Sequence, residues 1–360
     1  MKKENELQLN IKLSYLPGLK SVVLAEVSRF PKLKVVGAGD EELYLEFFPG
    51  FKMVKKLRSI LNAYIIKRSP VLHTRFISNH KSILGDIVEG IIDDSGETFK
   101  TFKISCAGSD SPEAKEIRDY IILTYKLVES ESADMEIYIG KSEMWEVGVR
   151  ITARPLSLRD YKVSNIPGGM NATIAYAMNS LCNLEKMDGG KNDAAVAKSY
   201  LNICSGSATL LIEAGLINPD LKLLGFDNNG KSIALAVENI KRAGLIKKIQ
   251  LRNVDIIEEA KIAVVSPAEI EKRDFIAADL PFGMQIAKGE DLTKLYTAFI
   301  SYSEKALNQD GTLAVYTTET ELFESLLKDS KFKIIKTLEL KVSTVVDAYI
   351  FPKIFICAIK

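Results

Sequence analysis

The chain of 360 residues has a mass of 39.9 kDa, which is more than one average domain needs, so we expect two or three compact units. Its 48 basic and 47 acidic residues give a formal net charge of +1, which argues against a protein held to nucleic acid by bulk charge alone. The two His and four scattered Cys show no metal-ligand spacing, so a zinc site and a disulfide framework are both disfavoured.

The first 150 residues change pattern often and predict two small α+β units. Residues 1–58 show strand patterns at 7–13, 34–36 and 43–47 and helical spacing at 19–30 and 51–61. Residues 59–152 show helical spacing at 82–92 and 112–128 and strand patterns at 101–105, 135–139 and 145–149. Residues 153–172 contain Pro and Gly without periodicity and are expected to form a linker.

From residue 173 onward, strand patterns alternate with helical ones. Strands are predicted at 200–203, 222–226, 249–254, 275–278 and 312–316, and helices at 173–182 and from near residues 208, 231, 292 and 319. This alternation predicts an α/β fold with a doubly wound parallel sheet over residues 173–360. The strand-rich stretch 332–360 is expected to close the sheet with an antiparallel edge.

Small residues follow the first strand of this sheet and precede a helix. Ser205, Gly206 and Ser207 let the backbone approach a ligand at the helix N-terminus, where the first amides are unpaired. Asp227 follows Gly206 by 21 residues, at the end of the next strand, where nucleotide-binding α/β folds hold ribose hydroxyls. Asp255 ends the third strand and is placed to reach an adenine edge. A tight turn with solvated strand-end carboxylates is the structural alternative.

The sequence DLPFG at residues 279–283 follows an apolar strand and carries the strongest chemical signal. The Asp279 carboxylate and the Leu280 carbonyl can both accept hydrogen bonds from an exocyclic amine, and Phe282 can stack on its base. Pro281 fixes its own φ and biases Leu280 toward an extended conformation, which presets the two acceptors. Orienting a weakly nucleophilic aryl amine toward an electrophilic methyl group supplies proximity and alignment. A Pro-containing turn is the structural alternative.

Residues 225–232 match the G-x-x-x-x-G-K-S pattern of a phosphate-binding loop. A phosphate loop needs unpaired amides and positive potential, yet this one would place the Asp227 carboxylate beside triphosphate oxygens. Phe226 also continues the strand pattern. A P-loop NTPase is therefore a minor alternative.

Residues 51–76 hold seven basic and no acidic residues, interleaved with Tyr64 and His73. Basic and stacking side chains together suit an RNA backbone and splayed bases, whereas a solvated helix face is the alternative. Residues 101–150 contain six basic and ten acidic residues and are not basic overall. The candidate RNA contacts in the basic segment are Lys55, Lys56, Arg58, Lys67 and Arg68.

These residues together resemble the THUMP-domain RNA methyltransferases, especially the S-adenosylmethionine-dependent tRNA guanine-N2 methyltransferases. The similarity rests on YLPGL at 15–19, RPLSLRDYKV at 154–163, the loop at 202–209, the G-x-D segment from 225 and DLPFG at 279–283. It implies a ferredoxin-like domain at 1–58, a THUMP RNA-binding domain at 59–152, a linker at 153–172 and a Rossmann-like class I methyltransferase domain at 173–360.

The resemblance also implies S-adenosyl-L-methionine as cofactor and tRNA as partner, with methyl transfer to the 2-amino group of a guanosine flipped out of its helix. Catalytic roles are implied for Asp279, Leu280, Pro281 and Phe282. Cofactor contacts are implied for Ser205, Gly206, Ser207, Ala208, Asp227, Asn228, Asp255, Ile256 and Asp279. Arg159 joins the five basic residues above as an implied RNA contact.

Two positions depart from the family pattern. Asn202 stands where the family has Asp, which removes a charge near the ammonium group of the cofactor, and Ala208 replaces a Gly. Neither change touches DLPFG, so we expect an active enzyme. The alternatives are a 23S rRNA guanine-N2 methyltransferase and a non-catalytic RNA-binding protein that lacks the cofactor. No apolar run approaches the roughly 20 residues of a membrane span, and the N-terminus has no secretory pattern, so a cytoplasmic location is expected.

Overall fold

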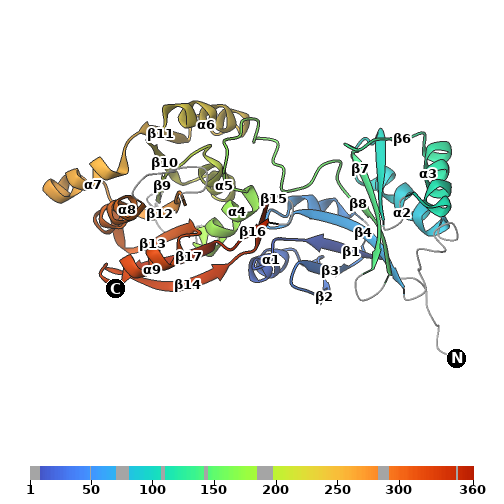
Figure 1. Cartoon of the computed structure of the whole chain (residues 1–360), viewed down its shortest axis with the longest axis horizontal. Coiled ribbons are helices and arrows are strands. Elements are labelled where there is room, and N and C mark those ends of the chain that lie inside the picture. The colour runs from blue at the N-terminus through green and yellow to red at the C-terminus, as the bar shows by residue number, and fades with distance from the viewer. Residues whose placement is uncertain are drawn as a thin grey trace. The chain divides into compact units, whose positions relative to one another are not determined.

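The computed structural model describes residues 9–48, 50–69, 81–106, 110–141, 145–184, 198–282, 292–345 and 348–360. The chain divides into two compact units (Figure 1). The first contains the chain up to residue 16 together with residues 23–158, and the second contains residues 17–22 and 159–360. Among the described residues, no helix is long and apolar enough to cross a membrane.

The first unit is built on one eight-stranded sheet with the strand order β2-β3-β1-β4-β8-β7-β5-β6. Its strands are β1 (Leu9–Ser14), β2 (Val35–Ala38), β3 (Glu42–Glu46), β4 (Asn62–Ser69), β5 (Thr101–Cys106), β6 (Val128–Glu129), β7 (Met135–Lys141) and β8 (Trp145–Arg150). Its helices are α1 (Lys20–Val27), the 3-10 helix η1 (Phe51–Lys56), α2 (Lys81–Asp94) and α3 (Pro112–Tyr125).

Strand β4 links the two N-terminal units that the sequence predicts as separate. It pairs antiparallel with β1 on one side and with β8 on the other. Hydrogen bonding therefore continues through one sheet across the expected boundary between residues 58 and 59. The sequence pattern does not predict this strand, because the buried Ala63, Ile65 and Ile66 are followed directly by Lys67 and Arg68, which resemble part of a charged face.

Apolar spacing accounts for the helices of this unit. Leu84, Ile87 and Ile91 recur at helical intervals along α2 and are buried, as expected for a helix with one face on a core. The helix predicted over residues 51–61 is shorter than expected, because Leu57 adopts an extended conformation (φ −68°, ψ 133°) and ends the 3-10 helix η1 while burying its side chain.

The second unit contains a seven-stranded sheet with the order β11-β10-β9-β12-β13-β17-β14 and a separate two-stranded sheet of β15 and β16. The strands are β9 (Ser199–Ile203), β10 (Lys222–Asp227), β11 (Ile249–Asn253), β12 (Arg273–Asp279), β13 (Leu307–Thr317), β14 (Phe332–Glu339), β15 (Val342–Val345), β16 (Ala348–Ile350) and β17 (Lys353–Ile359). The helices are α4 (Ala172–Leu181), α5 (Thr209–Ile217), α6 (Gly230–Arg242), α7 (Ile256–Val265), the 3-10 helix η4 (Pro267–Glu269), α8 (Leu292–Ala306) and α9 (Thr320–Lys328).

Strands β9 to β13 of this sheet are parallel, and the last part of the chain adds an antiparallel edge. Neighbouring pairs among β11, β10, β9, β12 and β13 all run in the same direction. Strand β17 lies between β13 and β14 and is antiparallel to both. The predicted α/β, Rossmann-like fold is therefore confirmed. Helix α7 was not predicted.

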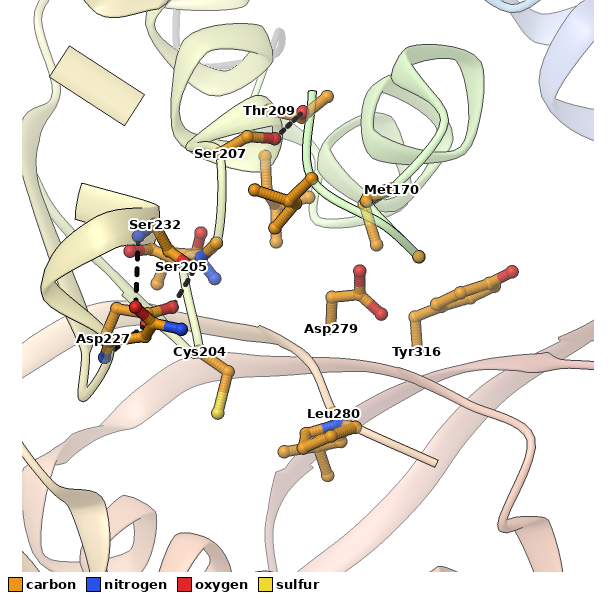
Figure 2. A pocket seen from close by; sticks show the side chains of 18 of the residues that line it. Met170, Cys204, Ser205, Ser207, Thr209, Asp227, Ser232, Asp279, Leu280 and Tyr316 are labelled. Atoms are coloured by element: carbon orange, nitrogen blue, oxygen red, sulfur yellow. Dashed lines mark hydrogen bonds between the residues drawn. The ribbon is translucent and has the colours of Figure 1, made fainter. Parts of the chain in front are cut away.

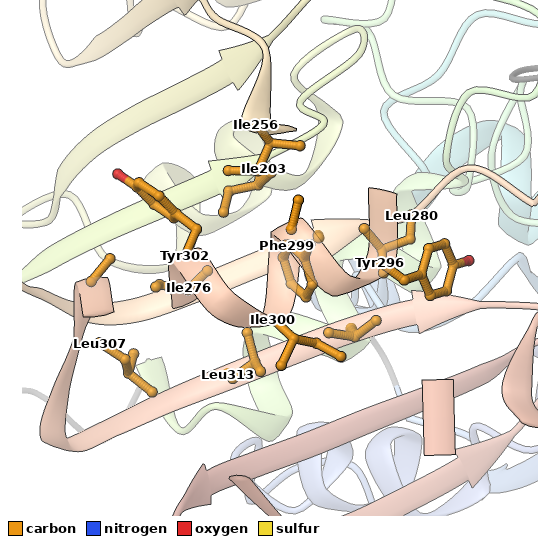
Figure 3. Packing of buried hydrophobic residues seen from close by; sticks show 14 of the residues in the cluster. Ile203, Ile256, Ile276, Leu280, Tyr296, Phe299, Ile300, Tyr302, Leu307 and Leu313 are labelled. Atoms are coloured by element: carbon orange, nitrogen blue, oxygen red, sulfur yellow. The ribbon is translucent and has the colours of Figure 1, made fainter. Parts of the chain in front are cut away.

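A hydrophobic cluster between this sheet and α8 supports the strand ends (Figure 3). Tyr296, Phe299 and Tyr302 of α8 are buried in it, together with Ile276 of β12. Leu280, the residue after β12, belongs to the same cluster with a fully buried side chain. The backbone at the end of β12 is thus attached to the core through the apolar side chain of Leu280.

Candidate active site

A cavity of about 990 Å³ lies in the second unit beside the carboxyl ends of β9, β10 and β12. In the sheet order, β10 lies on one side of β9 and β12 on the other. The connection from β9 leads to β10 on one side, whereas the connection from its neighbour β12 leads to β13 on the other side, and this kind of switch point is where open α/β sheets bind ligands. The segments predicted from the sequence, 205–207, 227–228 and 279–282, all line this one cavity.

The loop from β9 to α5 folds tightly through left-handed backbone conformations. Cys204, Gly206 and Ala208 have φ values of 57°, 50° and 63°. The Ser205 amide donates to the Phe226 carbonyl at 2.9 Å, and the Ala208 amide donates to the Ser205 carbonyl at 2.8 Å. Because a side chain destabilises the left-handed conformation, Ala208 is strained at the position where the family pattern has glycine.

Asp227 connects this loop to the next strand (Figure 2). Its Oδ2 accepts the Gly206 amide at 2.7 Å, and its Oδ1 accepts the Asn229 amide at 2.9 Å. The structure thereby brings together the two residues that the sequence paired across 21 positions. Each carboxylate oxygen has two lone pairs, so both oxygens keep acceptor capacity for ligand hydroxyls.

The phosphate-loop interpretation of residues 225–232 is wrong. Gly225 and Phe226 belong to β10, and α6 begins at Gly230, so no long loop separates the strand from the helix. The Asn229 side chain caps α6, where its Oδ1 accepts the backbone amides of Lys231 at 2.9 Å and of Ser232 at 3.3 Å. The amides that a phosphate would need are therefore already occupied.

Asp255 takes a different position from the other predicted cofactor residues. Its Oδ1 accepts the Ile257 amide at 2.8 Å and so caps α7. The side chain is exposed, and among the described residues the cavity wall here is formed by Val254 and Ile256 instead. A cofactor contact through the Asp255 carboxylate remains a prediction.

The Asp279–Phe282 segment is held in place from both sides. The Leu280 amide donates to the Tyr316 carbonyl of β13 at 3.0 Å. The Tyr296 hydroxyl of α8 donates to the Pro281 carbonyl at 3.1 Å and lies 2.6 Å from Thr317 Oγ1. The four segment residues line the cavity, whereas the last residue of the motif, Gly283, lies outside the described residues.

Asp279 has an unusual electrostatic environment. Burial raises the pKa of its carboxyl group to about 7, although the Lys162 ammonium opposes this shift. Tyr316 lies opposite Asp279 on the neighbouring strand (Figure 2), and burial together with the Asp279 charge raises the pKa of its hydroxyl well above the usual value. Perturbed ionisable groups in a cavity are typical of functional sites.

Lys162 comes from the linker and was not predicted as a site residue. Its Nζ donates to the Met170 carbonyl at 2.7 Å, and Met170 lines the cavity. Burial lowers the pKa of Lys162, while the charges of Asp279 and Glu213 raise it. The linker was expected only to connect domains, but residues 166–171 form part of the cavity wall.

Two buried polar atoms beside the β9 loop have no hydrogen-bond partner among the described residues: Asn202 Oδ1 and Ser205 Oγ. Asn202 is 1% exposed, and its Nδ2 donates to the carbonyls of Ile203 and Ala277 at 3.1 Å each. Asn202 and Ser205 both line the cavity. Because buried polar groups are normally hydrogen-bonded, these two atoms fit a polar ligand that completes the site.

The predicted RNA-binding residues are mostly engaged in ion pairs. Lys55 Nζ lies 2.6 Å from Glu97 Oε1, Lys67 Nζ lies 3.6 Å from Asp86 Oδ2, and Arg68 Nε lies 3.2 Å from Glu146 Oε1. Arg58 is half-buried, and Lys56 is exposed. Of the basic residues predicted in this segment, Lys56 is therefore the best placed to meet a phosphate.

The assignment of Arg159 to RNA is corrected by its burial. Its side chain is 8% exposed, and its Nε lies 3.1 Å from Oε1 of the fully buried Glu213. The Tyr161 hydroxyl donates to the same oxygen at 2.7 Å. Arg159 therefore neutralises a buried carboxylate on α5 and fixes the linker to the second unit.

Comparisons with known proteins agree with this site. Residues 159–347 match a family model described as UPF0020, RMKL-like, methyltransferase domain. The chain is 29% identical over 246 residues to U6 snRNA (guanine-N(2))-methyltransferase THUMPD2 of Bos taurus, covering 66% of this chain and 44% of that protein. It is 23% identical over 216 residues to tRNA (guanine(6)-N2)-methyltransferase of Methanocaldococcus jannaschii, covering 50% and 52%. The chain thus spans about half the length of the curated relatives it matches.

Solved structures share the fold of the whole chain. TrmN from Thermus thermophilus superposes with a TM-score of 0.74 at 18% identity, covering 98% of this chain and 100% of that one. A possible methylase from Clostridium difficile 630 gives a TM-score of 0.66 at 16% identity, covering 98% of both chains. At these identities the likeness shows the fold. Because the family model covers more than half of the residues, the chain belongs to the RMKL-like methyltransferase domain family UPF0020.

Proposed function

We propose that the protein is an S-adenosylmethionine-dependent RNA methyltransferase that methylates the 2-amino group of a guanosine in tRNA. The observation that carries the proposal is the Asp279–Phe282 segment, fixed in one cavity with the Gly206–Asp227 pair. Membership of a methyltransferase family supports the chemistry. The names of the relatives, which act on guanine N2 of U6 snRNA or tRNA, support the acceptor atom and an RNA substrate.

The residues of the β9 and β10 ends suit the cofactor. Asn202 Oδ1 and Ser205 Oγ are acceptors without partners among the described residues, and an ammonium group or another ligand donor would satisfy them. The Asp227 carboxylate can accept from ribose hydroxyls while it holds the Gly206 amide. When bound, S-adenosylmethionine supplies an electrophilic methyl group on a sulfonium ion.

The Asp279–Phe282 segment, which we call the clamp, would orient the amine. The Asp279 carboxylate and the Leu280 carbonyl accept its two N–H groups, and Phe282 stacks on the guanine ring. Among the described residues, the Leu280 carbonyl accepts no hydrogen bond, so it is available for this role. The Tyr296 hydroxyl holds the Pro281 carbonyl at 3.1 Å and keeps the adjacent acceptors in position.

Asp279 is also the group that would take the proton released on methylation. With its pKa raised to about 7, the ionised carboxylate is a stronger base than an ordinary aspartate while still being present at neutral pH. Glu213, the other buried carboxylate near Lys162, is paired with Arg159 and accepts from Tyr161, so it is not equivalent.

The RNA contacts of the first unit belong to the proposal as well. We assign residues 59–152 to a THUMP domain that binds the tRNA, with Lys56 near its border as one phosphate contact. U6 snRNA is the second candidate substrate, because the Bos taurus relative named for it shares 29% identity over 246 residues. We favour a catalytic role over the non-catalytic alternative because hydrogen bonds at Leu280 and Pro281 hold the Asp279–Phe282 segment at the cavity.

Nucleoside mass spectrometry tests the proposal. The purified protein is incubated with S-adenosylmethionine and either an unmodified tRNA transcript pool or a U6 snRNA transcript. We expect N2-methylguanosine in the tRNA pool and, by isothermal titration calorimetry, saturable binding of S-adenosylmethionine. Methylation of U6 snRNA alone would change the assigned substrate. Cofactor binding without N2-methylguanosine in either RNA would contradict the assigned acceptor atom, and no cofactor binding would favour the non-catalytic alternative.

A further inference from the structure

The β15–β16 hairpin is a short insertion between β14 and β17 (Figure 1). Val342, Ser343, Thr344 and Ile350 line the cavity together with Asp279. The base of the hairpin is closed by a hydrogen bond from the Leu340 amide to the Pro352 carbonyl at 2.9 Å, and Leu340 is buried. The hairpin therefore forms a wall of the site and is anchored where it leaves the sheet.

Two exposed aromatic rings lie on this hairpin and directly after it. Val342 is paired with Ile350 and Ser343 with Tyr349, so residues 349 and 350 point to opposite faces of the hairpin. Tyr349 is 53% exposed and Phe351 is 56% exposed. The Lys341 ammonium lies 4.2 Å from the centroid of the Tyr349 ring. We call the side chains of Lys341, Tyr349 and Phe351 the hairpin platform.

The platform lies in a basic part of the second unit. Residues 331–360 contain six lysines and two acidic residues, although the whole chain has a net charge of only +1. Lys331, Lys333 and Lys336 are exposed at and along β14, the edge strand that leads into the hairpin. Lysines on an edge strand also discourage aggregation, but that role does not account for exposed aromatic rings beside a cavity.

We propose that the hairpin platform binds a single-stranded stretch of the substrate RNA next to the nucleotide that enters the cavity. The inference rests on the proposed function and names a surface of the second unit that would hold the substrate. Exposed aromatic rings flanked by lysines are the combination that binds single-stranded nucleic acid, because the rings stack on bases and the ammonium groups meet phosphates. The same hairpin forms part of the cavity wall, so RNA bound to the platform would lie next to the nucleotide in the cavity.

Fluorescence anisotropy with a fluorescein-labelled single-stranded RNA of mixed sequence tests the platform directly. Replacing both rings in Y349A/F351A should weaken binding at least about fivefold, as expected from the loss of one stacked base. The matched variant Y349L/F351L keeps apolar surface but removes the rings and should lose as much, whereas Y349F/F351Y should bind like the wild type. Retained affinity in the leucine variant would overturn stacking and with it the proposed platform.

Photocrosslinking locates the contact independently of affinity. RNA of the same sequence that contains 5-iodouridine should crosslink to the tryptic peptide of residues 342–353, which holds both rings. Absence of that peptide among the crosslinks would overturn the proposal. Both readouts use RNA binding alone, so they remain decisive if the protein transfers no methyl group. Conversely, if Y349A/F351A methylates RNA at the wild-type rate with unchanged RNA affinity and KM, the platform is refuted and the proposed function stays intact.

Discussion

The cavity of the second unit could be predicted from the sequence better than the ion pairs in the basic segment of the first unit. At the cavity, Gly206, Asp227 and Asp279 lie at the ends of neighbouring parallel strands, so strand order alone places them together. In the basic segment, acidic partners arrive from other strands and helices: Asp86 pairs with Lys67, and Glu146 pairs with Arg68. A motif tied to sheet topology is therefore predictable, whereas a local count of charges does not reveal cross-strand ion pairs.

Glu146 shows that charged side chains of the first unit are paired with one another inside the fold. It is 2% exposed, and its oxygens accept from Lys12 at 2.9 Å, from Tyr44 at 2.9 Å and from Tyr138 at 2.7 Å. Burial alone would raise the pKa of Glu146, but the Lys12 ammonium and the two hydroxyls hold it below the usual value. The basic residues around it serve the fold as much as any partner.

Removing the Asp279 carboxylate should have the largest effect. We expect Asp279→Ala to lower kcat/KM for tRNA methylation by about a hundredfold to ten-thousandfold, because it removes an amine acceptor and the proposed base. Binding of S-adenosylmethionine, measured by calorimetry, should change little. Asp279→Asn is the matched control of equal size. Turnover close to wild type in both variants would contradict the role of the clamp.

Breaking the Glu146 network should cause the largest loss of stability. Glu146→Ala removes the buried acceptor shared by Lys12, Tyr44 and Tyr138, and although Lys12 keeps its pair with Glu42 at 3.0 Å, the loss should cost about 3 kcal/mol of unfolding free energy. Urea unfolding followed by the fluorescence of Trp145, the only tryptophan, reports on this unit. The control is Glu129→Ala, which breaks an exposed pair with Arg118 and should cost under about 1 kcal/mol. Equal costs would mean that the network is not structural.

The pH dependence of methylation should follow Asp279. The amine needs the ionised carboxylate, so kcat/KM should be full above the Asp279 pKa of about 7 and fall as pH drops through it. Below that value the decrease should approach about tenfold per pH unit. In Lys162→Met, loss of the positive charge that faces Asp279 and Glu213 should move the midpoint to higher pH. Lys162→Arg should keep the wild-type midpoint, and an unmoved midpoint in the methionine variant would exclude this coupling.

Relieving the strained turn should have a small stabilising effect. Ala208 has a φ of 63°, so Ala208→Gly should raise the free energy of unfolding by roughly 0.5–1 kcal/mol. The same substitution inside α5, Ala214→Gly, should instead destabilise. Thermal unfolding of the two variants compares them, and destabilisation by Ala208→Gly would show that its buried methyl group outweighs the strain.

The smallest expected effect is on tRNA binding, and it should differ between the exposed Lys56 and the paired Arg68 of the basic segment. Lys56→Gln should weaken tRNA binding about twofold to threefold and reduce the slope of log affinity against log salt by about 0.7–0.9, as for one phosphate contact. Arg68→Gln should leave that slope unchanged, because Arg68 is paired with Glu146. A larger change in slope for Arg68 than for Lys56 would reverse the assignment.

Much of the second unit could be predicted because strand and helix patterns alternate regularly there. The site residues that were missed lack such a signal. Tyr296 looks like any core residue of a helix, and Lys162 lies in a stretch without periodicity, so only the fold shows that they reach Pro281 and Met170. The boundary between a ferredoxin-like and a THUMP domain near residue 58 remains a prediction, since β4 continues one sheet across this region.

The hydrogen bond from Tyr296 to Pro281 joins two points of the chain that lie 15 residues apart. It closes a ring that begins at the clamp and ends in the second turn of α8, and Leu280 and Thr317 fix that ring to the core and to β13. The clamp is therefore held by α8 and β13, two elements that follow it in the chain and supply none of its acceptors. A substitution in either element would shift the acceptors for the amine without changing any residue that contacts it.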